Sequence, residues 1–138
     1  MADTNKQGPL YSLRKKIKKL FYSSQAYLDT NGVCPTKDIM AVTLDKWSLF
    51  CMYNLGFYGT MRFNELKSKI DGVSSRMLSV TLKRLEQHKV VTRKVYAEVP
   101  PRVEYDLTTF GSEWAAKVID LTNWFVENHE MKVHEKVK

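Results

Sequence analysis

Apolar residues recur through most of this chain at the three- and four-residue spacing of an amphipathic helix, so the pattern predicts a mainly helical protein. The first such stretch begins at Leu10, after a polar segment, residues 1–9, that we expect to be disordered. Asn31-Gly32 ends it, because this dipeptide is typical of turns. The apolar stripe consists of Leu10, Leu13, Ile17, Leu20, Phe21, Tyr27 and Leu28.

The other side of this predicted helix is basic, with Arg14, Lys15, Lys18 and Lys19. A basic amphipathic helix can lie on an anionic membrane, bind nucleic acid or dock its apolar side on a partner. We favour docking, because burial of the stripe is the usual reason for such a pattern.

Two helices are expected next. Pro35 suits the first position of a short helix, since its missing N–H is not needed there. A second helix follows through Trp47 until Gly56 and Gly59, which mark a loop. Its apolar positions at helical spacing are Leu44, Trp47, Cys51 and Leu55.

The middle of the chain predicts a short strand and two further helices. The sequence TMRF at 60–63 is the short strand, and a brief helix with Phe63, Leu66 and Ile70 on its apolar side follows. Asp71-Gly72 is a turn. Ser74 or Ser75 can then cap a helix over 74–88 by accepting a hydrogen bond from its exposed N–H groups.

Two strands are expected over 91–97 and 102–107, where apolar and charged residues alternate. Pro100-Pro101 belongs at the tip of this hairpin, since proline cannot donate to a strand ladder. Thr108 can start a last helix that runs to about Glu130. This order of elements is that of a winged helix-turn-helix, a mainly α fold with a small β-hairpin, in the α+β class.

The 74–88 helix has an unusual outward face. Leu78, Leu82 and Leu85 form its inner line, with Met77 and Thr81 on the flank, and we expect these residues in the core. The residues on its outward side are Arg76, Ser79, Val80, Lys83 and Gln87, and together with Ser75 they are the candidate DNA-binding residues of this helix.

Such a face fits the major groove of a duplex. Arginine and lysine can donate to guanine, serine and glutamine can pair with base edges or phosphate, and Val80 can touch a thymine methyl group. The alternative is an ordinary solvated face with one exposed valine, which is common. The helix alone favours neither interpretation.

The hairpin carries Arg93 and Lys94 before its tip and Arg102 after it. A wing could place these cations on phosphates or in the minor groove, where they would set affinity more than sequence specificity. The alternative is a solvated hairpin whose charges serve solubility.

Charge is segregated along the chain, whose formal net charge is +7. Residues 74–102 hold seven basic side chains against two acidic ones, whereas residues 104–130 hold six acidic side chains against Lys117. This arrangement presents one cationic face to an anion. The chain has no apolar run long enough for a membrane span and a polar N-terminus, so we expect a cytoplasmic protein without a membrane partner.

The last helix is apolar over about 200°, twice the width that a surface helix needs. We expect the excess to pack against a second copy with help from the N-terminal arm. The alternative is burial within the monomer under that arm. The predicted dimer interface consists of Leu13, Ile17, Leu20, Trp114, Leu121, Trp124 and Phe125.

The expected organisation therefore has four parts. Residues 1–31 are the disordered tip and basic helical arm, and residues 32–110 are the winged helix-turn-helix DNA-binding domain. Residues 108–131 are the C-terminal dimerisation helix, and residues 132–138 are a loose basic tail.

Several short motifs occur in order along the chain: Cys34-Pro35, Lys46-Trp47, RFNEL at 62–66, GVSSRML at 72–78, LKRLE at 82–86 and VYAEVPPRVEYDLT at 95–108. From about Cys34 to Gly111 the sequence closely resembles the HxlR-type family of winged helix-turn-helix transcriptional regulators, and the last motif is the most specific. The resemblance implies a homodimeric bacterial or archaeal regulator on a two-fold-related operator, with the 74–88 helix reading bases and the 91–107 hairpin as wing.

The chain departs from that family at two places. Lys89 stands where the family usually has glycine after the recognition helix, and Leu44-Asp45 stands where a glycine pair usually precedes Lys46-Trp47. A lysine in a left-handed conformation costs roughly 1 kcal/mol, so the turn before the second strand could differ in shape. The resemblance does not cover the long N-terminal arm.

The two cysteines do not form a disulfide framework, which favours a reducing compartment. Cys34 would cap a helix whose dipole stabilises a thiolate, so it is a candidate redox sensor. In the resembling family some members sense oxidants through a cysteine at this position. We favour a half-buried cysteine without a switch role at Cys34, and we place Cys51 in the core.

Enzymatic chemistry has little support. His129 and His134 are five residues apart, so on a helix they would diverge by about 140° and could not share a zinc ion. The sequence contains no phosphate loop and no nucleophile elbow, and we predict no metal and no cofactor. The favoured function is sequence-specific binding of a double-stranded DNA operator by a homodimer. The alternative is a winged-helix module for protein interaction or RNA binding, and the sequence identifies no small-molecule effector.

Overall fold

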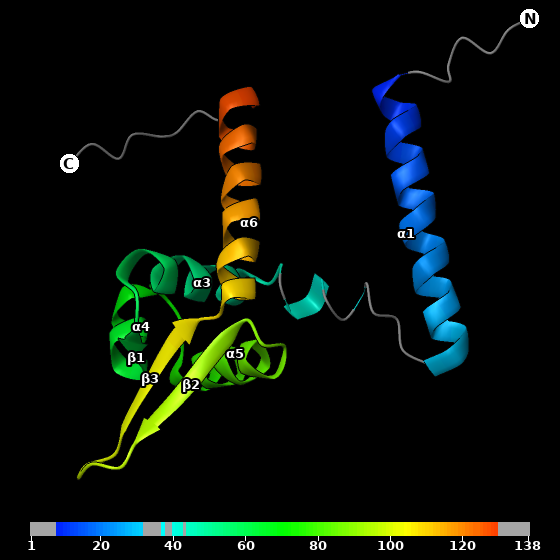
Figure 1. The fold of residues 1–138 in the computed structure, drawn as a ribbon. Coiled ribbons are helices and arrows are strands. Elements are labelled where there is room, and N and C mark those ends of the chain that lie inside the picture. Colours follow the sequence, from blue (N-terminus) through cyan, green and yellow to red (C-terminus); the bar gives the residue numbers. More distant parts are fainter. Residues whose placement is uncertain (1–7, 32–36, 38–39, 43, 130–138) are drawn as a thin grey trace, which may run out of the picture. The chain divides into compact units, whose positions relative to one another are not determined.

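A computed structural model describes residues 8–31, 37, 40–42 and 44–129 (Figure 1). Its contacts divide the chain into two units, Met1–Thr43 and Leu44–Lys138. Residues 1–7, Gly32, Cys34 and Pro35 lie outside the described residues, as does the 132–138 tail, so the predictions made for them stay predictions.

The first unit contains α1 (Pro9–Asn31), which confirms the predicted N-terminal helix. It begins at Pro9, one residue before the first apolar position, as proline's fixed backbone angle allows. Leu13, Ile17 and Leu20 are all exposed along this helix, so this part of its apolar stripe is not buried within the unit that contains it.

The second unit opens with α3 (Lys46–Tyr58). The Asp45 carboxylate accepts a hydrogen bond of 3.2 Å from the Ser48 N–H and so caps the helix start. Asp45, at one of the positions where the sequence departs from the family it resembles, thus has a structural role.

The predicted end of this helix at Gly56 is wrong. The helix continues through Gly56 to Tyr58 and ends at Gly59, whose φ of 79° suits a residue without a side chain. Cys51, Met52 and Leu55 are buried along its inner face. Packing of these residues outweighs the cost of about 1 kcal/mol for a glycine inside a helix.

The next three elements match the sequence pattern. They are β1 (Met61–Arg62), α4 (Phe63–Lys69) and α5 (Ser75–Gln87). Ser74 is the residue that caps α5: its hydroxyl accepts a hydrogen bond of 3.0 Å from the Met77 N–H.

The inner line of α5 is buried as expected, with Leu78, Leu82 and Leu85 at no more than 1% exposure and Thr81 buried beside them. Met77, also expected in the core, is 39% exposed, which corrects that prediction. Of the five residues of this helix that were expected in the core, Met77 lies furthest round the helix from the leucine line at about 100° per residue, so it falls at the edge of the contact with the core.

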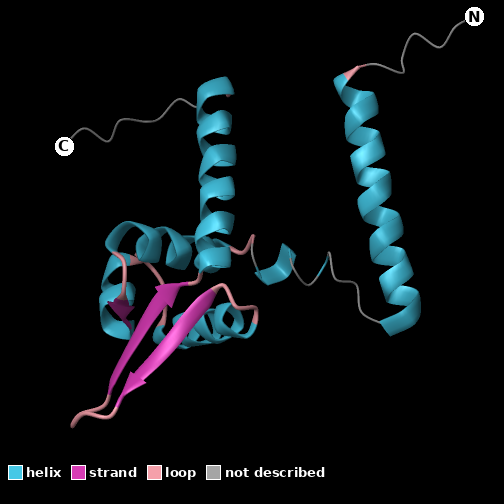
Figure 2. Cartoon of the chain, viewed as in Figure 1, coloured by secondary structure: helices cyan, strands magenta, loops and turns pink. Residues whose placement is uncertain are grey.

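The wing consists of β2 (Val91–Tyr96) and β3 (Arg102–Leu107), which pair antiparallel, and Pro100-Pro101 lies in the connecting loop (Figure 2). β1 pairs with the other edge of β3, so the sheet has three strands in the order β1-β3-β2. The predicted mainly α fold with a small hairpin is confirmed as a winged helix-turn-helix with this three-stranded sheet.

The chain ends in α6 (Thr109–Asn128), whose start is attached to the turn that follows α5. The Thr108 hydroxyl accepts a hydrogen bond from the Gly111 N–H and donates one of 2.6 Å to the Lys89 carbonyl. The Thr108 N–H donates to the Val90 carbonyl at 3.1 Å. A Cβ atom at Gly111 would collide with that same carbonyl, so only glycine permits this close approach.

The hydrophobic core lies where α3, α5 and the sheet meet, and α6 covers part of α3. Its most completely buried large side chains are Met52, Leu55, Leu66, Leu78, Leu82 and Leu85. Cys51 is buried among them, and burial raises the pKa of its thiol to about 12, with the nearby Asp45 carboxylate adding to the shift. Cys51 is therefore a neutral core residue, as predicted. Among the described residues, no helix is long and apolar enough to cross a membrane.

Lys89 adopts the left-handed conformation that its glycine-type position demands, with φ of 57°. The turn therefore keeps the shape that glycine would give it, at an energetic cost to the lysine. Lys89→Gly should raise the free energy of unfolding by up to about 1 kcal/mol, measured by urea denaturation.

Lys89→Ala is the matched control, because it removes the same charge but keeps the Cβ atom. It should not stabilise the protein. Equal stability of the two variants would show that the left-handed conformation at residue 89 carries no strain.

Candidate nucleic-acid interface

The outward face of α5 is fully available to a partner. All six predicted DNA-binding positions on this helix are exposed, and the bare side chain of Val80 is 45% exposed. The buried leucine line fixes the helix from the opposite side, so this face is presented on a rigid element. These six positions are Ser75, Arg76, Ser79, Val80, Lys83 and Gln87.

The charges of Arg76 and Lys83, the two cations of this face, are not neutralised by an ion pair among the described residues. Among the described residues, the ion pairs within 4.0 Å involve Arg84 and Arg102, and neither Arg76 nor Lys83 takes part in one. The described part of the acidic segment that begins at Glu104 therefore forms no ion pair with either cation of the face that we expect to meet DNA.

Arg84, on the flank of α5, has a different role from its neighbours. Its guanidinium lies 4.0 Å from the Asp45 carboxylate, and both side chains are about one-third exposed. A part-exposed pair of this kind contributes little stability, but it links α5 to the cap of α3.

The wing cations do not share one surface. Arg93 is paired with Tyr105 and Lys94 with Glu104 in the antiparallel register. Because successive strand residues point to opposite sides, Arg93 and Lys94 face opposite ways. Arg93 is on the side of Tyr105, which faces the core, whereas Lys94 is on the side of Glu104.

Arg102 is engaged within the wing itself. Its Nη2 atom lies 3.3 Å from Glu98 Oε1, and its Nε atom lies 3.3 Å from Glu104 Oε1. Its guanidinium also stacks over the Tyr96 ring at 4.0 Å from the centroid. Two carboxylates and a ring thus hold the residue that the sequence pattern placed among the phosphate contacts.

The contacts of Arg102 could be anticipated from the sequence only in part. Glu98 and Glu104 were visible as neighbours of Arg102, but the ring contact depends on Tyr96 being paired directly with Arg102 across the strands. That register follows from the length of the loop between the strands, which a local pattern does not define.

The predicted dimer residues lie on two helices in different units. On α6, Leu121, Trp124 and Phe125 are 59%, 59% and 48% exposed, and Trp114 is half-buried. Ala115 and Val118 supply the buried contact of this helix with its own unit. The apolar arc of α6 is therefore wider than the surface that its own unit covers.

Comparison with known proteins identifies the fold and the family. The model of the HxlR-like helix-turn-helix family matches residues 42–133, a stretch that begins after α1. YtfH of Escherichia coli strain K12, an uncharacterised HTH-type transcriptional regulator, is 38% identical over 95 residues, which are 69% of this chain and 75% of the relative.

Two solved structures share the fold at comparable identity. The redox regulator HypR in its oxidised form is 35% identical with a TM-score of 0.60, over 70% of this chain and 99% of HypR. The reduced form of the transcriptional regulator YodB of Bacillus subtilis is 30% identical with a TM-score of 0.61, over 71% of this chain and 96% of YodB. On this evidence, the chain belongs to the HxlR-like helix-turn-helix family and is a transcriptional regulator of the helix-turn-helix type, not an enzyme.

Proposed function

We propose that this regulator recognises a specific, two-fold-related operator in double-stranded DNA as a homodimer. In this proposal α5 enters the major groove and the 91–107 hairpin is the wing. The observation that carries the proposal is the outward face of α5, where Arg76 and Lys83 are exposed on either side of the exposed Val80 and neither has a carboxylate partner in the part of the chain that the structure describes.

The chemistry of this face suits base edges better than phosphates alone. Arg76 and Lys83 can donate to guanine O6 and N7, and the hydroxyl of Ser79 and the amide of Gln87 can pair with other base edges. Val80 has no hydrogen-bonding group, so its natural contact in the groove is a thymine methyl group. Ser75, at the start of the helix, is placed to donate to phosphate.

The wing supplies the sequence-independent part of the affinity. Arg93 projects from the side of the sheet that faces the core and therefore α5, so it is the better placed of the two exposed wing cations to reach a phosphate beside the groove. Lys94 projects from the side that also carries Glu104 and Asp106, which lowers the positive potential there. Arg102 supports the wing through its ion pairs and ring contact.

Dimerisation would use apolar side chains that each chain leaves exposed, together with the half-buried Trp114. The proposed interface consists of Leu13, Ile17, Leu20, Trp114, Leu121, Trp124 and Phe125. Large exposed apolar patches mark interaction sites in soluble proteins. A two-fold dimer built on these residues would set its two α5 helices roughly 34 Å apart, one turn of DNA.

Selection of bound sites from random duplex DNA tests the operator proposal. The recovered motif should be symmetric, with half-sites about one helical turn apart, and Arg76→Ala should reduce discrimination at one base pair per half-site by about 1 to 3 kcal/mol. Lys67→Ala, which removes an exposed cation from α4, is the matched control and should leave the motif unchanged.

An asymmetric motif would contradict the homodimer arrangement. Preferential recovery of RNA from a mixed pool would favour the alternative function, a winged-helix module for RNA, and no enrichment of either nucleic acid would favour a protein-interaction module.

Arg93 and Lys94 lie on opposite faces of the hairpin, so their substitutions should have different effects on affinity for DNA. Arg93→Ala should weaken binding to all duplexes similarly and reduce the slope of log affinity against log salt by about 1, because one phosphate contact is lost. Lys94→Ala should have a smaller effect. A larger loss for Lys94→Ala, measured by fluorescence anisotropy across a salt series, would mean that the wing meets DNA through its other face.

A thiol response is the second functional candidate, favoured by the similarity to the redox regulator HypR. Cys34 is the candidate sensor, since Cys51 is buried with a raised pKa and is poorly suited to react as a thiolate. The alternative is that Cys34 has no switch role.

Treatment with the oxidant diamide should therefore change operator affinity in the native protein and in Cys51→Ala, but not in Cys34→Ser. Operator affinity before and after treatment is the measurement. An identical response in Cys34→Ser and the native protein would exclude Cys34 as the sensor.

A further inference from the structure

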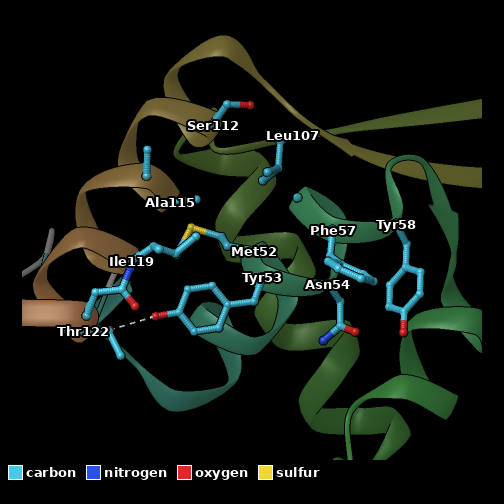
Figure 3. Close-up of a pocket in the computed structure, with 13 residues that line it drawn as sticks. Met52, Tyr53, Asn54, Phe57, Tyr58, Leu107, Ser112, Ala115, Ile119 and Thr122 are labelled. Atoms are coloured by element: carbon cyan, nitrogen blue, oxygen red, sulfur yellow. Dashed lines mark hydrogen bonds between the residues drawn. The ribbon is translucent and has the colours of Figure 1, made fainter. Parts of the chain in front are cut away.

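A large pocket lies between α3 and α6, wholly within the unit that starts at Leu44 (Figure 3). Its volume is about 800 Å³, which is within the range of small-molecule sites. Met52, Tyr53 and Phe57 of α3 form one wall, and Ala115, Ile119 and Thr122 of α6 form the other.

The lining of this pocket indicates the chemical class of a ligand. None of the thirteen lining residues is charged, so a charged ligand would lose its hydration without gaining a counter-charge. Phe57 and Tyr58 lie edge to face with ring centroids 4.8 Å apart, and Phe57 is 82% exposed. These rings and the Met52 side chain favour a flat aromatic molecule.

The Tyr53 hydroxyl on one wall of the pocket can form a hydrogen bond with a ligand. The Tyr53 hydroxyl is 3.4 Å from the Thr122 hydroxyl, longer than the usual O–H···O distance of about 2.7 to 2.8 Å (Figure 3). Thr122 already donates a shorter bond of 2.8 Å to the Val118 carbonyl. The Tyr53 hydroxyl can therefore exchange its weak contact for a better one with a polar atom of a ligand.

The same wall is connected to the recognition helix. Ser112, the first pocket residue of α6, follows Gly111, which packs directly against the Val90 carbonyl. Val90 in turn donates a hydrogen bond of 2.9 Å to the Leu85 carbonyl of α5. A shift of α6 against α3 must therefore disturb the turn that ends α5.

We propose that this pocket binds a neutral aromatic effector that carries a hydrogen-bonding group, and that occupation of the pocket alters the affinity of the protein for DNA. The regulatory part rests on the proposed DNA-binding function. The effector separates or fixes the walls on α3 and α6, and the attachment of Thr108 and Gly111 to Lys89 and Val90 transmits this change to α5.

Two fluorescent probes with the same ring system test the binding site in the full-length protein. N-phenyl-1-naphthylamine is neutral, and 1-anilinonaphthalene-8-sulfonate adds one negative charge. The neutral probe should bind saturably, with one probe per chain. The anionic probe should bind to the same site at least tenfold more weakly than the neutral probe. Displacement of the anionic probe by the neutral probe identifies the shared site.

Ala116→Trp places a large side chain in the pocket, whereas Lys117→Trp adds the same indole one position away, outside the lining. Ala116→Trp should reduce neutral-probe affinity at least tenfold, and Lys117→Trp should leave it unchanged. Equal probe binding by the two variants would overturn the proposal. Binding that appears only when the protein is diluted to monomers would also overturn it, because a second copy would then cover the pocket.

The regulatory step has its own measurement. Saturating neutral probe should change affinity for duplex DNA by about fivefold or more in the native protein and in Lys117→Trp, and not in Ala116→Trp. Probe binding without any change in duplex affinity would overturn the regulatory step. Duplex binding in the absence of probe tests the proposed function separately, so failures of the two proposals are distinguishable.

Discussion

The contact between the start of α6 and the turn after α5 is the constraint on which the rest of the second unit depends. Thr108 and Gly111 bind the backbone of Lys89 and Val90 through three hydrogen bonds and one close approach that excludes a Cβ atom. This contact joins the end of α5, the beginning of the wing and the base of the last helix at one point. It also explains why the turn keeps its shape although it places a lysine in a left-handed conformation: the carbonyls of both turn residues are held from outside.

The distribution of charge follows the same geometry. The cations that α5 presents outward are unpaired among the described residues, whereas Glu104 of β3 and Glu98 of the loop before it neutralise Arg102 within the wing. A count of basic residues therefore overstates the positive charge that the hairpin can offer to DNA, because Arg102 is already paired. The same count describes the outward face of α5 correctly. A positive surface that is concentrated on one helix and one side of the wing favours a single orientation on a duplex, because the other side of the hairpin carries carboxylates.

Much of the fold could be predicted from local patterns, and the errors share one cause. Periodicity identified α1, α4, α5 and both wing strands, because each buries a regular stripe or alternates regularly along the chain. The end of α3 at Gly56 and the burial of Met77 were expected wrongly, and the ion pairs and ring contact of Arg102 were not foreseen. Each of these depends on a tertiary neighbour: the core beneath α3, the edge of the contact under α5, and the cross-strand position of Tyr96. The pocket escaped prediction for the same reason, since its walls come from helices about sixty residues apart and no short motif marks either.

The last helix contributes to two surfaces, a buried contact within its own unit and an exposed apolar surface. Its buried contact through Ala115 and Val118 holds it to α3, while its exposed Leu121, Trp124 and Phe125 remain for a partner. If two copies pair through these residues, any tilt of α6 against α3 changes the position of each α5 relative to the two-fold axis. DNA with a fixed distance between half-sites tolerates little change of this kind, because both recognition helices must enter successive major-groove turns together. A ligand that fills the pocket between α3 and α6 would thus act on both half-sites at once, and with one ligand per chain the differential affinities of the two sites for the two arrangements would multiply in the change of operator affinity.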